Sequence, residues 1–156
     1  MSVLVEVCLE SVESALIAEK SGASRIELCS ALDLGGISPS KALIEEVCNA
    51  VKIPVFVLIR PRQGNFIYTN SEIKLMIRDI EIAIESGAKG IVSGALDNNY
   101  NIDIQATKEL IKTANNLPFT FHRAFDQVAK PFEALNQIID LGAKRILTSG
   151  QKPKAI

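Results

Sequence analysis

The most distinctive chemical feature of the sequence is a Glu-x-Cys pattern that occurs twice. Glu6 and Cys8 lie in the run VEVC, and Glu27 and Cys29 lie in IELC, and we expect all four at the carboxyl ends of their strands. Residues two apart in a strand point to the same face, so each glutamate shares a face with its cysteine. If the two runs are neighbouring strands, the thiols lie about 5 Å apart. Two thiolates at that spacing suit a soft metal ion of low coordination number, such as copper(I).

The competing interpretation is that both cysteines are small buried hydrophobic residues, which is the usual role of a free cysteine. The third cysteine, Cys48, falls on an apolar helical stripe with Leu43, Ile44 and Val47, so we expect it to serve packing. An odd number of cysteines also argues against a disulfide framework.

A second group of reactive side chains lies in the run TFHRAFD. His122 is the only histidine, and it follows a short alternating run typical of a strand. A general acid or base needs a carboxylate within hydrogen-bond reach, and Glu27 or Asp126 would supply one. The candidate catalytic residues are therefore Glu27, His122 and Asp126. The alternative is a histidine whose hydrogen bonds are purely structural.

Arginines at the ends of predicted strands suggest an anion-binding region. Arg60 and Arg62 open the long connection RPRQGNFIYTN, and Arg123 follows the histidine. Together with Ser149 they are candidates to bind a small anionic ligand. Solvated arginines, or structural Glu–Arg bridges between strands, are the alternative.

Two kinds of apolar segment alternate along the whole chain. Short runs rich in β-branched residues predict six strands, at 3–8, 25–29, 55–59, 90–94, 119–122 and 145–149. Segments with helical periodicity lie between them. This alternation predicts parallel strands joined by helical crossovers, in a single domain over residues 1–156.

Helix boundaries have their own signals. Ser11 is a plausible N-cap, while Ser38-Pro39 and Lys130-Pro131 each predict a proline at the first position of a helix. The glycines that follow three helical stretches suit a left-handed residue after the helix end; they are Gly22, Gly87 and Gly142.

Two architectures fit this order of elements, a doubly wound sheet and a TIM barrel. No G-x-G-x-x-G follows the first strand, and Glu6 and Glu27 fall inside strands. A central strand of an open parallel sheet is covered on both faces, where an unpaired carboxylate would cost several kcal/mol. A barrel interior accommodates such groups. We therefore favour an incomplete (β/α) barrel of about six parallel strands, without the last two or so βα units of the usual eight.

Composition excludes several classes of partner. The formal net charge of the 156-residue chain is -1, and its basic residues are scattered, so we expect neither nucleic acid nor an anionic membrane as partner. No apolar run approaches the roughly 20 residues that a membrane helix needs. The amino terminus lacks the basic region of a signal peptide, and we expect a cytoplasmic protein.

The successive segments of this chain resemble the copper-homeostasis protein (CutC) family. The likeness is carried in order by EVCLESVESALIAEKSGASRIELCSALDLGGISPS, IPVFVLIRPRQGNFIYT, GIVSGALD, LPFTFHRAFD and RILTSG. The resemblance implies a TIM barrel and a role in intracellular copper handling. It would place copper(I) binding on Cys8 and Cys29. An enzymatic activity is not a settled part of the family's properties.

The sequence departs from the family pattern at its end, where QKPKAI replaces a further helix, two strands and a glycine-rich segment. The first and sixth strands are then expected to be open edges. Either the chain is a fragment, or it completes its sheet as a homo-oligomer. Two functions remain open: copper homeostasis through copper(I)-binding cysteines, and a lyase- or isomerase-like enzyme acting on an anionic substrate.

Overall fold

Six parallel strands form one curved sheet in the computed structural model, which describes residues 3–153. The strands follow one another in chain order across the sheet, so β1 and β6 are its edges. Their bounds are Glu6–Leu9 (β1), Arg25–Leu28 (β2), Val55–Leu58 (β3), Gly90–Ser93 (β4), Phe119–Phe121 (β5) and Arg145–Ile146 (β6). All six coincide with predicted strands, although β1 starts later and β6 is shorter than predicted.

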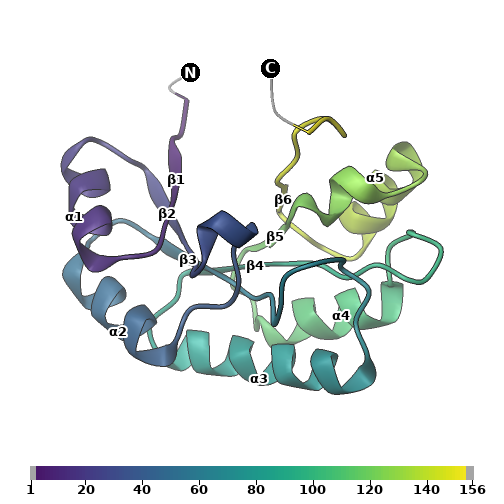
Figure 1. Cartoon of the computed structure of the whole chain (residues 1–156), viewed down its shortest axis with the longest axis horizontal. Helices are drawn as coiled ribbons and strands as arrows, with labels where there is room; N and C mark the ends of the chain where they lie inside the picture. Colours follow the sequence, from purple (N-terminus) through teal and green to yellow (C-terminus); the bar gives the residue numbers. More distant parts are fainter. Residues whose placement is uncertain (1–2, 154–156) are drawn as a thin grey trace.

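The helices lie on the outer side of this curved sheet (Figure 1). They are α1 (Val12–Lys20), α2 (Lys41–Ala50), α3 (Asn70–Glu85), α4 (Ile104–Thr113) and α5 (Pro131–Asp140). Two short 3-10 helices, η1 (Leu32–Leu34) and η2 (Arg123–Gln127), follow β2 and β5. The elements describe an arc whose two ends are β1 and β6 (Figure 1). The predicted incomplete barrel is confirmed.

Local sequence signals explain where most helices begin and end. Ser11 caps α1 by accepting a hydrogen bond from the Ser14 N–H, and Pro131 is the first residue of α5, as predicted. The prediction for Ser38-Pro39 was wrong, because Ser40 is the N-cap of α2 and Pro39 precedes it. The three glycines predicted after helix ends all have positive φ angles: Gly22, Gly87 and Gly142.

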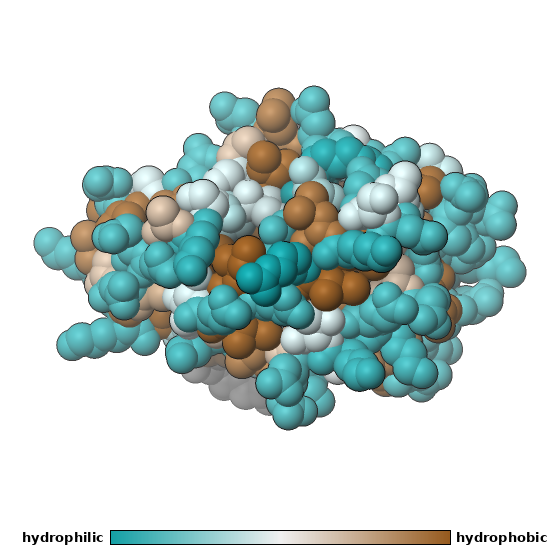
Figure 2. Space-filling model, turned by 90° about the horizontal axis from the view of Figure 1, so that it is seen from below, coloured by the Kyte–Doolittle hydropathy of each residue, from teal (hydrophilic) through white to brown (hydrophobic). Residues whose placement is uncertain are grey.

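The hydrophobic core lies between the sheet and the helices. Alternate strand residues such as Ile26, Val57 and Ile91 are fully buried there, against helical side chains that include Val47 and Met76. The outward surface over α3 is largely hydrophilic, with single hydrophobic side chains between the polar ones (Figure 2). No helix within residues 3–153 is long and apolar enough to cross a membrane.

The residues of opposite parity point into the concave side of the arc. Phe56, Leu58, Val92 and Cys29 form a separate buried cluster there. Gly90 makes room for this cluster, because a Cβ on it would lie 2.4 Å from the Phe56 ring. The concave side is therefore the barrel interior, and its two ends carry the polar groups.

Candidate functional site

A cavity of about 150 Å³ opens at the carboxyl ends of the strands, where parallel α/β folds place their sites. Its wall includes six of the residues singled out in the sequence, contributed by β1, β2 and the segments that directly follow β2, β3 and β5. The complete lining is Cys8, Glu27, Cys29, Leu32, Gly35, Leu58, Arg60, Phe66, His122, Arg123 and Leu147. Both cysteines, one glutamate and the histidine thus share one small space.

The ladder between β1 and β2 places Cys8 opposite Glu27, and not opposite Cys29. Glu6 pairs with Arg25 and Leu9 with Leu28, and the Cys29 N–H donates to the Leu9 carbonyl at 2.9 Å. The predicted direct juxtaposition of the two cysteines was therefore wrong. They are diagonal neighbours, with Cα atoms about 8 Å apart by ordinary strand spacing and rise.

Glu27 is buried in the barrel interior, with 4% of its surface exposed. Burial, together with the charge of Glu6, raises the pKa of its carboxyl from 4.5 to about 7. Its Oε2 atom has no hydrogen-bond partner among residues 3–153, whereas Oε1 accepts from the Cys29 thiol at 3.7 Å. At neutral pH this carboxyl is consequently divided between its charged and neutral forms.

The two thiols are held in their protonated form by their surroundings. Burial and the neighbouring Glu27 raise the pKa of Cys8 to about 12 and raise that of Cys29 further. Cys29 is buried, whereas the surface of Cys8 is exposed. A metal ion that binds here must therefore displace protons, and Cys8 is the thiol that it meets first.

His122 is buried at the base of the cavity. Its Nδ1 accepts a hydrogen bond from the Ala124 N–H at 3.3 Å, and its ring packs 4.7 Å from that of Phe66. Burial and the nearby charge of Arg60 lower its pKa from 6.5 to about 3. Its Nε2 has no partner in the part of the chain that the structure describes, so neither expected carboxylate hydrogen-bonds it.

Arg60 lines the cavity, and most of its guanidinium donors are used in hydrogen bonds to the backbone. Its guanidinium donates to the carbonyl oxygens of Gly35, Gly36 and Gly64 at 3.1, 2.9 and 2.8 Å, and lies 4.8 Å from the centre of the Phe66 ring. Only Nε lacks a partner among the described residues. Most of its donors therefore fasten the connections after β2 and β3 to the barrel.

Arg62 lies outside the cavity wall. It forms an ion pair with Glu72, donates to the carbonyl of Ile67 at 2.7 Å, and stacks over Tyr68. Glu72 also completes the capping box of α3 with Thr69. The sequence predicted an anion-binding role for Arg62, but its guanidinium is engaged in holding this long connection onto α3.

Asp126 organises the segment after β6. Its carboxylate accepts from the Thr148 hydroxyl at 2.5 Å, the Arg123 Nε at 2.8 Å, and the N–H groups of Ser149 and Gln151. Burial alone would raise the pKa of Asp126, but these hydrogen bonds hold it well below its usual value. Asp126 thus positions Arg123 and Ser149 rather than facing His122.

A wider basin of about 420 Å³ adjoins the cavity and shares Gly35, Arg60, Phe66 and Arg123 with it. The basin adds Lys152 on the far side. Phe66, which packs against His122 and Arg60, was not singled out in the sequence. Its only signal there was an aromatic residue in the long connection after the third strand.

Glu6 was predicted to lie at the carboxyl ends, which was wrong. It is the first residue of β1 and pairs with Arg25, the first residue of β2, so it belongs to the opposite end of the barrel. Within residues 3–153, no group of three or more His, Cys, Asp or Glu side chains is placed to hold a metal ion. A copper site here would rest on the two cysteines.

A family model for the CutC family matches residues 3–156. The chain belongs to the CutC family. It is 48% identical to the family protein CutC of Histophilus somni, over 97% of this chain and 62% of that protein. It is 49% identical to the human copper homeostasis protein cutC homolog, over 98% of this chain and 56% of that protein. The chain therefore spans about 60% of the length of these curated relatives.

Solved structures support the same assignment. The putative copper homeostasis protein CutC from Streptococcus agalactiae superposes with a TM-score of 0.92 at 36% identity, over 97% of this chain and 75% of that one. A phosphonopyruvate hydrolase in complex with oxalate and Mg²⁺ superposes with a TM-score of 0.68 at 16% identity, over 94% of this chain and 58% of that one. The second likeness concerns the fold alone.

Proposed function

We propose that this chain acts in copper homeostasis and binds copper(I) through the thiolates of Cys8 and Cys29. The observation that carries the proposal is their shared position on the wall of one cavity at the carboxyl ends of β1 and β2. Thiolates are the protein ligands that copper(I) prefers. The names of the curated relatives, which include copper homeostasis protein, support the same role.

Copper(I) binding in this cavity would replace the protons of the two thiols. Two S–H bonds break, two Cu–S bonds form, and two protons leave the thiols. Glu27 lies directly across from Cys8 and within 3.7 Å of the Cys29 sulfur. Because its pKa is about 7, this carboxyl can take up a thiol proton and release it again at neutral pH, so both protons leave the cavity. Cys8, which is exposed, lies on the same cavity wall as Cys29.

A second candidate function is catalysis on a small anionic substrate, and one observation favours it. Glu27 and His122 line the same cavity with pKa values shifted in opposite directions, to about 7 and about 3. Paired groups with separated pKa values are typical of acid–base sites. In that function Arg123, on the rim, would bind the anionic group, and Arg60 would position the histidine ring through Phe66.

The deciding experiment is a titration of copper(I) against a competing chelator under anaerobic conditions. We expect one copper(I) per chain for the parent protein and a loss of at least tenfold in affinity for Cys8→Ser and for Cys29→Ser. Cys48→Ser is the matched control, because Cys48 lies on α2, outside the cavity wall. Unchanged affinity in the Cys8→Ser/Cys29→Ser double variant would exclude the cysteine site and leave the catalytic function as the better candidate.

A further inference from the structure

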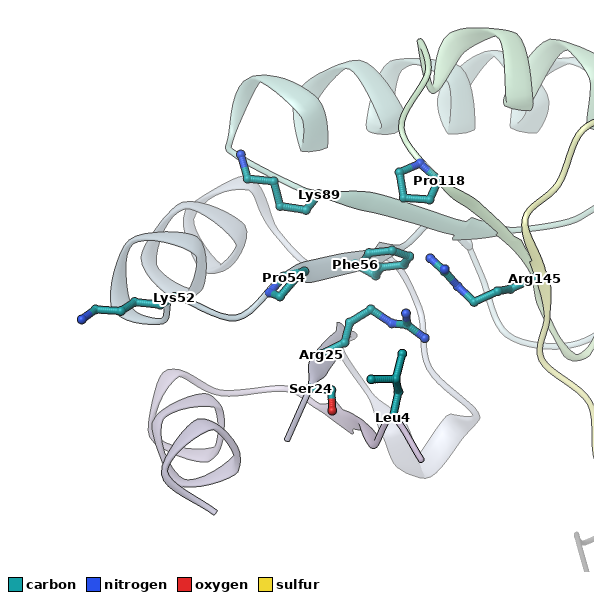
Figure 3. A pocket seen from close by; sticks show the side chains of 9 residues that line it. All are labelled: Leu4, Ser24, Arg25, Lys52, Pro54, Phe56, Lys89, Pro118 and Arg145. Carbon is teal, nitrogen blue, oxygen red and sulfur yellow. The ribbon is translucent and has the colours of Figure 1, made fainter. Parts of the chain in front are cut away.

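The opposite, amino-terminal end of the barrel holds a larger cavity, of about 590 Å³ (Figure 3). Four of its nine lining residues are basic and none is acidic. The lining is Leu4, Ser24, Arg25, Lys52, Pro54, Phe56, Lys89, Pro118 and Arg145. This cavity is separate from the one at the carboxyl ends, because the two share no lining residue.

Two guanidinium groups lie against a single aromatic ring in this cavity. The Cζ atoms of Arg25 and Arg145 are 4.6 and 4.7 Å from the centre of the Phe56 ring. The side chains come from the starts of β2, β6 and β3, and both guanidinium groups are turned toward the ring (Figure 3). The Phe56 ring occupies the space that a side chain at position 90 would fill, and Gly90 leaves that space open.

The two arginines are not equally neutralised. Arg25 forms an ion pair with Glu6, whose side chain is largely buried. Arg145 has no ion pair, and its Nε and Nη2 atoms are buried without a hydrogen-bond partner among residues 3–153. Burial and the charge of Arg25 lower the pKa of Arg145, whereas the charge of Glu6 opposes this shift. A guanidinium with two buried donors that lack partners favours an acceptor that carries negative charge.

The rim adds positive charge without occupying the space around Phe56. Lys52 and Lys89 line the outer part of the cavity, and their ammonium ends point away from the two arginines (Figure 3). Ser24 supplies a hydroxyl beside Arg25. Concave, positively lined walls attract small anions, and a guanidinium fork matches an oxyanion with two acceptor oxygens.

We propose that this cavity binds a small oxyanion with the geometry of phosphate or a carboxylate, held by Arg145 and Arg25 on the Phe56 ring. The Nε and Nη2 donors of Arg145 contact the anion, and Arg25 stays paired with Glu6 while contributing its charge. The site does not depend on copper(I) binding, because no residue of the cysteine cavity takes part.

The test is calorimetric titration of the chain with inorganic phosphate and with malonate, at constant ionic strength maintained with chloride. We expect saturable binding of one anion per chain, weakened at least tenfold by Arg145→Met, which keeps an apolar stem against Phe56. Lys144→Gln is the matched control, because Lys144 precedes Arg145 in the chain but lines a different cavity. It removes the same charge and should leave the affinity unchanged.

Further variants decide where an anion binds and guard against a folding defect. Arg145→Lys keeps the charge but not the fork, and we expect intermediate affinity with an unaltered circular dichroism spectrum. If phosphate binds the parent and Arg145→Met equally well, or if Arg123→Met abolishes binding, the anion is held at the carboxyl-end basin and the proposal is wrong. No binding above the chloride background also overturns it. Cys8→Ser/Cys29→Ser should bind phosphate like the parent, whatever the copper titration shows.

Discussion

Cys8 lies opposite Glu27 in the ladder between β1 and β2, and the same carboxyl accepts a hydrogen bond from the Cys29 thiol. This arrangement couples the protonation of all three groups. A negative charge on Glu27 raises the pKa of each thiol, and a thiol that donates to Glu27 lowers the pKa of the carboxyl. Any cation that enters the cavity reverses this balance by favouring the charged forms.

Copper(I) affinity is expected to rise steeply with pH. Because both thiols are protonated at neutral pH, each bound ion releases two thiol protons, and the association constant grows about 100-fold per pH unit. Chelator competition at pH 6, 7 and 8 measures this slope. Cys8→Ser should reduce it to about tenfold per unit. A slope that is the same in Cys8→Ser as in the parent would show that Cys8 is not a ligand.

Glu27→Gln is expected to change how stability depends on pH. Folding raises the pKa of this carboxyl from 4.5 to about 7, so the protonated carboxyl is favoured in the folded state. Its contribution to stability is fully present below pH 4.5. That contribution is lost as the pH rises through 7. Urea unfolding should therefore show Glu27→Gln gaining up to about 3 kcal/mol relative to the parent between pH 4.5 and 7.5. The exposed Glu133→Gln is the control, and a pH-independent difference would contradict the buried state of Glu27.

Gly90→Ala is expected to destabilise the protein by about 1–3 kcal/mol, the usual cost of overpacking a core. The added Cβ would lie 2.4 Å from the Phe56 ring, which must then move from beneath Arg25 and Arg145. Urea denaturation measures the loss. In a Phe56→Leu background the same substitution should cost less, and an equal cost in both backgrounds would show that the ring is not the obstacle.

The alternation of residue types predicted parallel strands joined by helices, and the glutamates inside two strands favoured a barrel over a doubly wound sheet. Strand parity and strand ends follow from the sequence, and they indicated that Cys8, Glu27 and His122 lie near the carboxyl ends of strands; the structure brings the three to one cavity. The register was not predictable, since the repeated Glu-x-Cys pattern suggested pairing like with like. The observed ladder is shifted by two residues from that pairing, so that Cys8 lies opposite Glu27, in keeping with the stagger of barrel strands. The same stagger moved Glu6 to the amino-terminal end.

The hydrogen-bond partners of the charged side chains could not be predicted from the sequence either. Arg62 and Asp126 were expected to face a ligand, but each is surrounded by hydrogen bonds within its own connection. Such networks depend on how a loop folds back, and residue type alone does not reveal this. Whether the remaining candidates bind copper(I) or an anion stays a prediction.

His122 is expected to remain neutral through the physiological pH range. Its pKa is lowered to about 3 by burial and by Arg60, so the stability it contributes is present above pH 6.5 and is lost as the pH falls toward 3. As the only histidine, it gives isolated ring signals in an NMR titration. Those signals should not shift between pH 8 and 5. A midpoint near 6.5 would show that the ring is solvated, and would remove the observation that favours catalysis.

Asp126→Asn is expected to loosen the segment after β6 and to cost about 2 kcal/mol, as for hydrogen bonds to a buried charge. The carboxylate accepts from Thr148, Ser149, Gln151 and Arg123, and an amide cannot accept from all of them. Because these bonds lower its pKa, the parent should lose this stabilisation as the pH falls below 3.8, whereas the variant should not.

Hydrogen exchange of the Ser149 and Gln151 amides measures the local effect of Asp126→Asn, and urea unfolding measures the global one. Glu133→Gln, which breaks the exposed pair with Lys130, is the matched control and should change stability by less than about 0.5 kcal/mol. If exchange quickens at these amides while the copper(I) affinity is unchanged, Asp126 supports the basin and not the cysteine cavity. If exchange is unaffected, the carboxylate does not hold this segment, and Arg123 must be positioned by other contacts.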